Sequence, residues 1–288
     1  MTRIAYINGR YQSIYYPAIF VEDRGYQFAD AVYEVCAIEG GRLLDVKAHL
    51  DRLTYSLKAI DIRAGHGSPL KSRRAMAMVM REVVRRNRID FGMLYIQVSR
   101  GVAVREHLPP KDIDPVLVMT CKPLDPTTRH RIHTKGIAAI SVPDIRWGRC
   151  DIKSVSLLAN VLAKQAANDK GAQEAWQVRD GLITEGASAN AWMIKGKTLH
   201  TAPIGFPILN GTIRKQIIAL AAKQGLRVQE KSFSIKAAQA GDECFSSAAT
   251  NGLLPIISLD GKKIGAGKNK GKVGAHTTAF IKLLNKSL

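Results

Sequence analysis

The residue with the clearest potential for chemistry is Lys153, which lies in residues 144–154 (DIRWGRCDIKS). This segment is dense in charged and aromatic side chains, and residues 155–168 after it carry apolar side chains at helical spacing. A lysine at the junction of a strand and a helix, beside apolar residues, can lose part of its solvation and hold its proton less tightly. A partly deprotonated amine can attack a carbonyl and form a Schiff base, so Lys153 is the first candidate for catalysis.

Other residues could contribute to the same chemistry. Glu185 follows an apolar run and precedes small residues that would let a flat ring approach. Gly211 and Thr212 open an expected helix, whose exposed N–H groups suit a phosphate. A second loop of small and hydroxyl residues covers residues 245–252. Each feature also has an ordinary interpretation, as a helix cap or a tight turn.

Arg105 and His107 form a further candidate pair. They are two positions apart on an expected extended segment, so their side chains would point the same way. Such a pair could bind a carboxylate through charge-assisted hydrogen bonds, although a surface ion pair is the ordinary alternative.

Composition indicates an ordinary globular protein. The chain has 288 residues, of which 46% are hydrophobic and 23% charged, and no apolar run approaches the roughly 18 residues of a membrane span. The start of the chain shows no apolar signal-peptide core, and the four cysteines form no CxxC or metal-ligand pattern. We therefore expect no metal site, no membrane partner and a cytoplasmic location.

The net charge of +19 is the unusual feature of the composition. Basic clusters occur at residues 81–88 and 262–272, but no nucleic-acid-binding motif accompanies them. A solvated surface is the favoured interpretation, and we expect no nucleic-acid partner.

The periodicity predicts an α+β chain with two domains. The expected domains are residues 1–121, a smaller N-terminal α+β domain with substrate-carboxylate residues, and residues 129–288, a larger domain that carries Lys153. Residues 122–128, with two prolines and no periodicity, would be the linker. The predicted helices are residues 46–60, 71–86, 155–168 and 212–223, the predicted strands include 93–100, 116–121 and 136–142, and hairpin turns are expected at 39–42, 179–181, 195–197 and 260–261.

Several longer runs occur in an order that spans nearly the whole chain: residues 23–28 with 32–35, 49–53, 105–107, 144–154, 162–165 and 184–186. With these runs the sequence resembles the fold type IV pyridoxal-phosphate aminotransferases, and within them most closely the bacterial D-amino acid aminotransferases. The resemblance implies a two-domain fold type IV enzyme that exchanges an amino group between a D-amino acid and a 2-oxo acid by a ping-pong mechanism, with pyridoxal 5'-phosphate as cofactor. It also implies a homodimer with the active site near the subunit interface.

The resemblance assigns roles to individual residues. Lys153 would hold the cofactor as a Schiff base and then move the proton, and Glu185 would pair with the pyridinium nitrogen. The α-carboxylate of the substrate would be bound by Tyr33, Arg105 and His107. The remaining cofactor-binding residues would be Arg52 at the phosphate, Leu209 on the ring, and Ser188, Thr212, Ile213, Ala248, Ala249 and Thr250.

The sequence departs from the family pattern at three places, all on the cofactor side. Gly211-Thr212-Ile213-Arg214 stands where the family commonly has Gly-Ile-Thr-Arg, Ala248 and Ala249 replace hydroxyl residues, and a serine-rich run is reduced to Ala187-Ser188-Ala189. We expect retained chemistry with weaker retention of the cofactor.

Two alternatives remain open. On the same fold, the chain could be a branched-chain L-amino acid or (R)-amine aminotransferase, or an aminodeoxychorismate lyase; the Arg105–His107 pair argues against these. In a different class, it could be a non-catalytic basic nucleic-acid-binding protein, against which the pair of Lys153 and Glu185 argues.

Overall fold

A computed structural model describes residues 3–16, 19–65 and 68–286 of the chain. It divides into two compact units, residues 1–125 with 152–156 and residues 126–151 with 157–288. We call them the N-terminal and the C-terminal unit. The segment 152–156, which carries Lys153, therefore belongs to the N-terminal unit, whereas the sequence placed it in the C-terminal domain.

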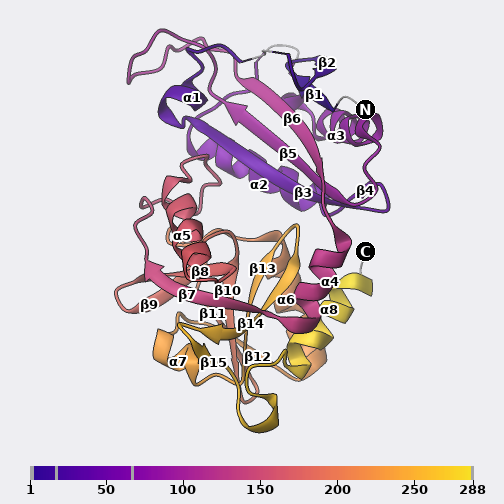
Figure 1. The fold of residues 1–288 in the computed structure, drawn as a ribbon. Coiled ribbons are helices and arrows are strands. Elements are labelled where there is room, and N and C mark those ends of the chain that lie inside the picture. The colour runs from indigo at the N-terminus through magenta and orange to yellow at the C-terminus, as the bar shows by residue number, and fades with distance from the viewer. Residues whose placement is uncertain (1–2, 17–18, 66–67, 287–288) are drawn as a thin grey trace. The chain divides into compact units, whose positions relative to one another are not determined.

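Within the described residues, the N-terminal unit is built on a six-stranded sheet with the order β2-β1-β6-β5-β3-β4 (Figure 1). Every neighbouring pair is antiparallel. The strands are β1 (Ile4–Ile7), β2 (Arg10–Ser13), β3 (Ala31–Glu39), β4 (Arg42–Leu43), β5 (Gly92–Ser99) and β6 (Val116–Pro123).

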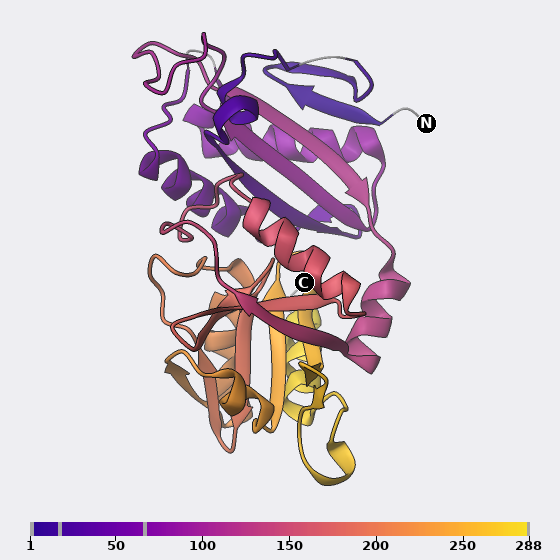
Figure 2. The ribbon, with the colours of Figure 1, turned by 60° about the vertical axis from the view of Figure 1, so that its left-hand side comes forward.

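Two helices cover one face of this sheet, α2 (Val46–Ala59) and α3 (Arg73–Asn87), and Figures 1 and 2 show both behind the strands. Their apolar faces pack on alternate residues of β3 and β5, among them Val32, Cys36 and Leu94. Because side chains alternate between the faces of a strand, Tyr33 and Tyr95 point to the opposite face. The short elements of the unit are α1 (Arg24–Phe28) and a 3₁₀ turn, Pro69–Lys71.

The C-terminal unit has a nine-stranded mixed sheet in its described part, with the order β12-β11-β10-β13-β14-β7-β8-β9 and β15 beside β14. Its strands are β7 (Ile137–Pro143), β8 (Glu174–Arg179), β9 (Leu182–Gly186), β10 (Asn190–Lys195), β11 (Thr198–Thr201), β12 (Arg227–Glu230), β13 (Glu243–Ala248), β14 (Gly252–Leu259) and β15 (Lys262–Lys263). The central strands are almost wholly buried, and Trp176, Trp192 and Phe245 fill the core.

Helices pack on this sheet from several parts of the chain. The helix α5 (Leu158–Asp169) packs on β8, while α6 (Thr212–Ala221) and α8 (Ala275–Lys286) pack on β13. The remaining elements are α4 (Pro126–Lys135), α7 (Ile235–Gln239) and the 3₁₀ turns Ala222–Gln224 and Gly267–Asn269.

Most of the predicted elements are confirmed to within a few residues. The helix expected at 46–60 is α2, and the one expected at 71–86 is α3. The hairpin turns at 179–181 and 260–261 place Asp180–Gly181 and Asp260–Gly261 at positive φ, as a tight two-residue hairpin requires. The strand and helix types therefore follow from local pattern and turn chemistry.

Two local predictions differ from the structure. The helix expected from Val155 begins at Leu158, because Val155 N–H donates to the carbonyl of Ala31 and Ser154 bridges to Val32. Within the expected linker 122–128, β6 continues to Pro123 and α4 begins at Pro126, since proline fits the first position of a helix.

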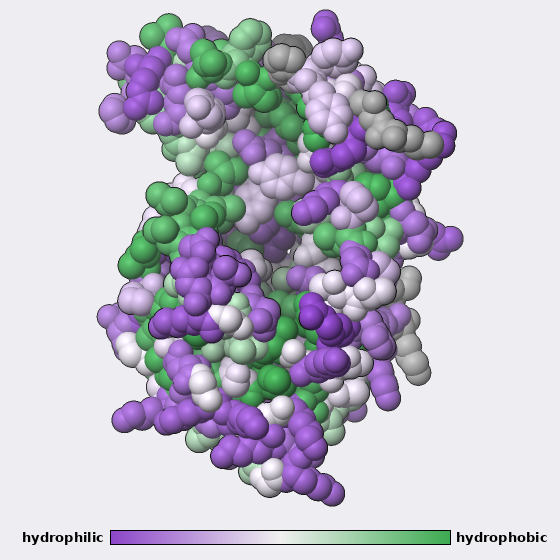
Figure 3. Space-filling view, viewed as in Figure 1, coloured by the Kyte–Doolittle hydropathy of each residue, from purple (hydrophilic) through white to green (hydrophobic). Residues whose placement is uncertain are grey.

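The excess positive charge lies on the surface. All five lysines between residues 262 and 272 are exposed, and hydrophilic side chains cover much of the face of the C-terminal unit in Figure 3. Among the helices that the structure describes, none has the length and apolar character needed to cross a membrane.

Candidate active site

Lys153 is fixed by an extended segment that pairs with the edge of β3. Its carbonyl accepts a hydrogen bond from Tyr33 N–H at 2.9 Å, and its own N–H donates to Ser56 Oγ of α2 at 3.2 Å. The side chain extends over the Tyr33 ring, with Nζ 4.1 Å from the ring centroid. Strand pairing therefore sets the backbone of Lys153, and an aromatic face sets the direction of its amine.

Tyr33 belongs to a polar patch on the face of the sheet that lies opposite α2. Its ring lies 5.8 Å from the ring of Tyr95, whose hydroxyl donates to Gln97 Oε1 at 2.7 Å. Burial and the neighbouring Tyr33 raise the pKa of Tyr95 to about 12, so its hydroxyl keeps its proton at neutral pH. The structure thus brings Tyr33 and Lys153 together and adds Tyr95, which the sequence did not single out.

Arg52 makes a buried ion pair with Glu34. Arg52 Nε and Nη2 donate to the two carboxylate oxygens of Glu34 at 2.7 and 2.8 Å, and His49 Nδ1 lies 2.7 Å from Glu34 Oε2. Burial alone would raise the pKa of Glu34, but the contacts with Arg52 and His49 outweigh it and lower this pKa to about 2. Glu34 therefore fixes the guanidinium of Arg52, the residue that the family resemblance assigned to the cofactor phosphate.

Arg105 and His107 lie in the loop between β5 and β6, and both side chains are exposed. The Arg105 guanidinium stacks on the Phe28 ring at 4.5 Å, and the His107 ring is 5.6 Å from the same ring. Among the residues that the structure describes, no hydrogen bond, ion pair or ring contact joins this pair to Tyr33. The described part of the structure therefore shows no direct contact between this pair and Tyr33, and the shared carboxylate-binding role of the three residues stays a prediction.

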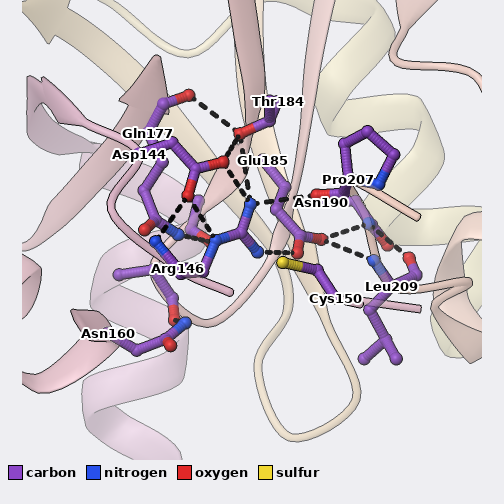
Figure 4. Close-up of polar contacts among 12 residues, drawn as sticks. Asp144, Arg146, Cys150, Asn160, Gln177, Thr184, Glu185, Asn190, Pro207 and Leu209 are labelled. Atoms are coloured by element: carbon purple, nitrogen blue, oxygen red, sulfur yellow. Dashed lines mark hydrogen bonds and ion pairs between the residues drawn. The ribbon is translucent and has the colours of Figure 1, made fainter. Parts of the chain in front are cut away.

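In the C-terminal unit, Glu185 stands at the centre of a hydrogen-bond network (Figure 4). Arg146 Nη1 donates to its Oε1, and Asn190 Nδ2 and Leu209 N–H donate to its Oε2 at 3.0 and 3.1 Å. The side chain of Glu185 is 8% exposed, so its carboxylate has little contact with solvent. The three donors therefore supply most of its hydrogen bonding.

Arg146 is held in turn by Asp144 and Thr184. Its Nε and Nη2 donate to Asp144 at 2.9 and 2.8 Å, and Nη2 also contacts Thr184 Oγ1 at 3.2 Å. Burial opposes the charge of Arg146, but Asp144 and Glu185 outweigh burial and raise its pKa. Burial also opposes the charge of Asp144, yet the hydrogen bonds from Arg146 and Thr184 lower the pKa of Asp144. A permanent cation therefore lies beside Glu185.

Asn190 connects the Glu185 carboxylate to the start of α6. Its Nδ2 also donates to the carbonyl of Leu209 at 2.8 Å. A Cβ atom on Gly211 would lie 2.3 Å from Asn190 Oδ1, so any larger residue here would displace the Asn190 amide. Asn190 is paired with Ser247, which directly precedes Ala248. The sequence did not assign a role to Asn190 or Arg146, whose hydrogen bonds to Leu209 and Glu185 reach across 19 and 39 positions of the chain.

The start of α6 and the end of β13 are both rich in small residues. Gly211 is the N-cap of α6 and has no side chain that could cap the first N–H groups of the helix. Thr212 and Ile213 are buried, whereas Ala248 at the end of β13 and Ala249 and Thr250 in the turn after it are partly exposed. Helix N–H groups beside small residues can hold a phosphate. Ser188, by contrast, is exposed in the bend between β9 and β10.

Each unit holds groups with a chemistry of their own. The C-terminal unit contains a buried carboxylate and a helix N-terminus, and the N-terminal unit contains an amine beside an aromatic ring. In the part of the chain that the structure describes, no group of His, Cys, Asp and Glu could hold a metal ion.

Comparisons with known proteins show the family and the fold to which the chain is similar. The family model for amino-transferase class IV matches residues 31–259. The chain is 38% identical to a D-alanine aminotransferase of Bacillus licheniformis, over 90% of this chain and 89% of that protein. A D-alanine aminotransferase of Staphylococcus haemolyticus is 36% identical, over 99% and 98%. The solved branched-chain amino acid aminotransferase of Escherichia coli has a similar fold, with a TM-score of 0.88 at 21% identity over 99% of this chain and 94% of that one.

Proposed function

The chain belongs to the amino-transferase class IV family, and on this premise we propose that it transfers an amino group between a D-amino acid and a 2-oxo acid with pyridoxal 5'-phosphate. The observation that carries the proposal is the nearly full-length likeness to D-alanine aminotransferases at 36–38% identity. The likeness to branched-chain aminotransferases is one of fold alone.

The residues of the C-terminal unit fit this cofactor. A ring nitrogen needs an anionic partner, and Glu185 is a buried carboxylate held by Asn190 and Leu209 N–H. A phosphate needs N–H donors and space, which the start of α6 and the neighbouring alanines offer. Gly211 leaves room where any larger residue would collide with Asn190.

Each residue of the proposed site then has a defined task. Bound pyridoxal phosphate supplies an electron sink for the substrate carbanion. Lys153 would hold the cofactor through Nζ and, when released, would move a proton at the substrate Cα. Glu185 would keep a proton on the ring nitrogen, and Leu209 would pack against the ring. The phosphate would be bound by Arg52, Thr212, Ile213, Ala248, Ala249 and Thr250, and Ser188 would be a further cofactor-binding residue.

Tyr33, Arg105 and His107 are proposed to bind the substrate α-carboxylate. We further propose that the protein is a homodimer, since large apolar side chains such as Phe20, Val21 and Leu108 are at least 72% exposed in the single chain. A cytoplasmic location is proposed because all four cysteines are buried free thiols.

An absorption spectrum of the purified protein tests this function. With pyridoxal phosphate bound through Lys153, we expect a band near ~400 nm that changes with D-alanine and not with L-alanine. A band that responds only to L-amino acids such as L-leucine would instead indicate a branched-chain L-amino acid aminotransferase. The absence of a band after addition of the cofactor would refute the proposed enzymatic function. Salt-dependent retardation of DNA would then favour a nucleic-acid-binding protein.

Replacing Asn190 with alanine is expected to weaken cofactor binding by about tenfold, since one or two buried hydrogen bonds to Glu185 and Leu209 are lost. The dissociation constant of pyridoxal phosphate measures this effect. Asn87→Ala is the matched control, because Asn87 Nδ2 also donates to two oxygens, the carbonyls of Ile4 and Val83, but in the N-terminal unit. Equal cofactor affinity in the two variants would contradict the role of Asn190.

A further inference from the structure

The loop that carries Arg105 and His107 is held by a buried arginine at the start of α1. Arg24 Nη1 donates to the carbonyl of Glu106 at 2.6 Å, and Nη2 donates to the carbonyl of His107 at 3.0 Å. The side chain of Arg24 is 4% exposed. A planar guanidinium can hold two carbonyls at once in a fixed geometry, which a lysine ammonium cannot reproduce.

Arg24 is itself fixed by an acidic partner. Its Nε donates to Asp30 Oδ2 at 3.0 Å, and Arg100 binds the two oxygens of the same carboxylate at 2.6 and 2.9 Å. Arg100 also donates to the carbonyls of Ile60 and Asp61. Asp30 thus compensates two neighbouring cations, and its position directs the remaining nitrogens of Arg24 to the loop.

Phe28 links this anchor to the side chains of the loop. The Arg24 guanidinium lies 4.7 Å and the Arg105 guanidinium 4.5 Å from the Phe28 ring centroid, and the His107 ring contacts the same ring. Elsewhere the loop borders an open pocket of about 330 Å³, lined in part by Val102, Pro110 and Asp112. The contacts with Arg24 and Phe28 therefore fix the part of the loop that carries Arg105 and His107.

We propose that Arg24 is a positioning residue for recognition of the substrate α-carboxylate. It fixes the backbone of Glu106 and His107, and so orders the side chains of Arg105 and His107 before the substrate arrives. The proposal rests on the proposed function, in which this pair binds the carboxylate. An unanchored loop would lose conformational entropy on binding, which weakens substrate binding but leaves the proton transfer at Lys153 unchanged.

The test compares Arg24→Lys with Arg100→Lys in the enzyme loaded with cofactor. Arg100 is the matched control because it shares Asp30 but contacts neither Glu106 nor His107. Arg24→Lys is expected to raise KM for D-alanine on the order of tenfold with kcat within about twofold. Propionate carries the carboxylate without the amine, and its competitive inhibition constant is expected to rise by the same factor. Arg100→Lys should change neither constant.

The possible results separate the proposal from the function on which it rests. Wild-type protein that fails to transaminate D-alanine would refute the proposed function. Wild-type activity with the same KM and propionate inhibition in both variants would overturn only the role of Arg24. If Arg24→Lys does not fold, Arg24→Gln replaces it, and failure of both variants to fold would assign Arg24 to the fold and overturn the proposal.

Discussion

Replacing Lys153 with alanine is expected to lower the turnover of D-alanine by at least about 10⁴-fold, because one amine both bonds the cofactor and moves the proton. The thermal midpoint should change little, since strand pairing with Tyr33 and the bond to Ser56 use the backbone of residue 153. Steady-state kinetics with D-alanine and a 2-oxo acid measure the effect.

The matched control is Lys195→Ala, which also removes a lysine with two oxygen partners, Ala240 and Asp242, but on an exposed hairpin. It should leave turnover unchanged. Addition of a small amine such as methylamine should partly restore the Lys153→Ala variant, since a free amine can accept the proton. A Lys153→Ala variant as active as the wild type would exclude Lys153 from the chemistry.

Replacing Glu34 with glutamine is expected to lower the free energy of unfolding by about 3–5 kcal/mol at pH 7, the typical cost of leaving a buried charge without its partner. Arg52 is the charge at risk, because its side chain is 11% exposed and Glu34 is fully buried. Urea denaturation measures the difference. Glu82→Gln is the matched control: Glu82 also pairs with two arginines, Arg85 and Arg86, but on an exposed helix face, so little change is expected.

The difference in unfolding free energy between wild type and Glu34→Gln is expected to depend on pH. The pKa of Glu34 is lowered from its ordinary value of 4.5 to about 2, so the folded state favours the ionised carboxylate. This contribution, about 3 kcal/mol for a shift of this size, is complete above pH 4.5 and is lost as the pH falls toward 2. The difference between wild type and Glu34→Gln should therefore shrink between pH 4.5 and 2. A difference that stays constant over this range would contradict the buried ion pair.

Local sequence patterns were sufficient for much of the fold. The helical spacing of Leu50, Leu53 and Leu57 predicted α2, and the Asp-Gly pairs predicted tight hairpins. Where the prediction was wrong, a distant partner decided the local structure: residues 154 and 155 pair with Val32 and Ala31 of β3 instead of starting a helix. Helical periodicity could not indicate that partner, because it lies more than 120 positions away in the chain.

The residue types also indicated the chemistry, but not the residues that hold the reactive groups in place. The ordered runs along the chain indicated the family by resemblance, and Lys153 by itself indicated a reaction at an amine. Only the tertiary structure determined what holds these groups: Tyr33 beside the amine, Asn190 and Arg146 around the carboxylate, and Arg24 beneath the loop. The physical reason is range. Helix, strand and turn preferences act between residues a few positions apart, whereas the hydrogen bonds of Arg146 and Arg24 reach across 39 and 82 positions that only the folded chain brings together.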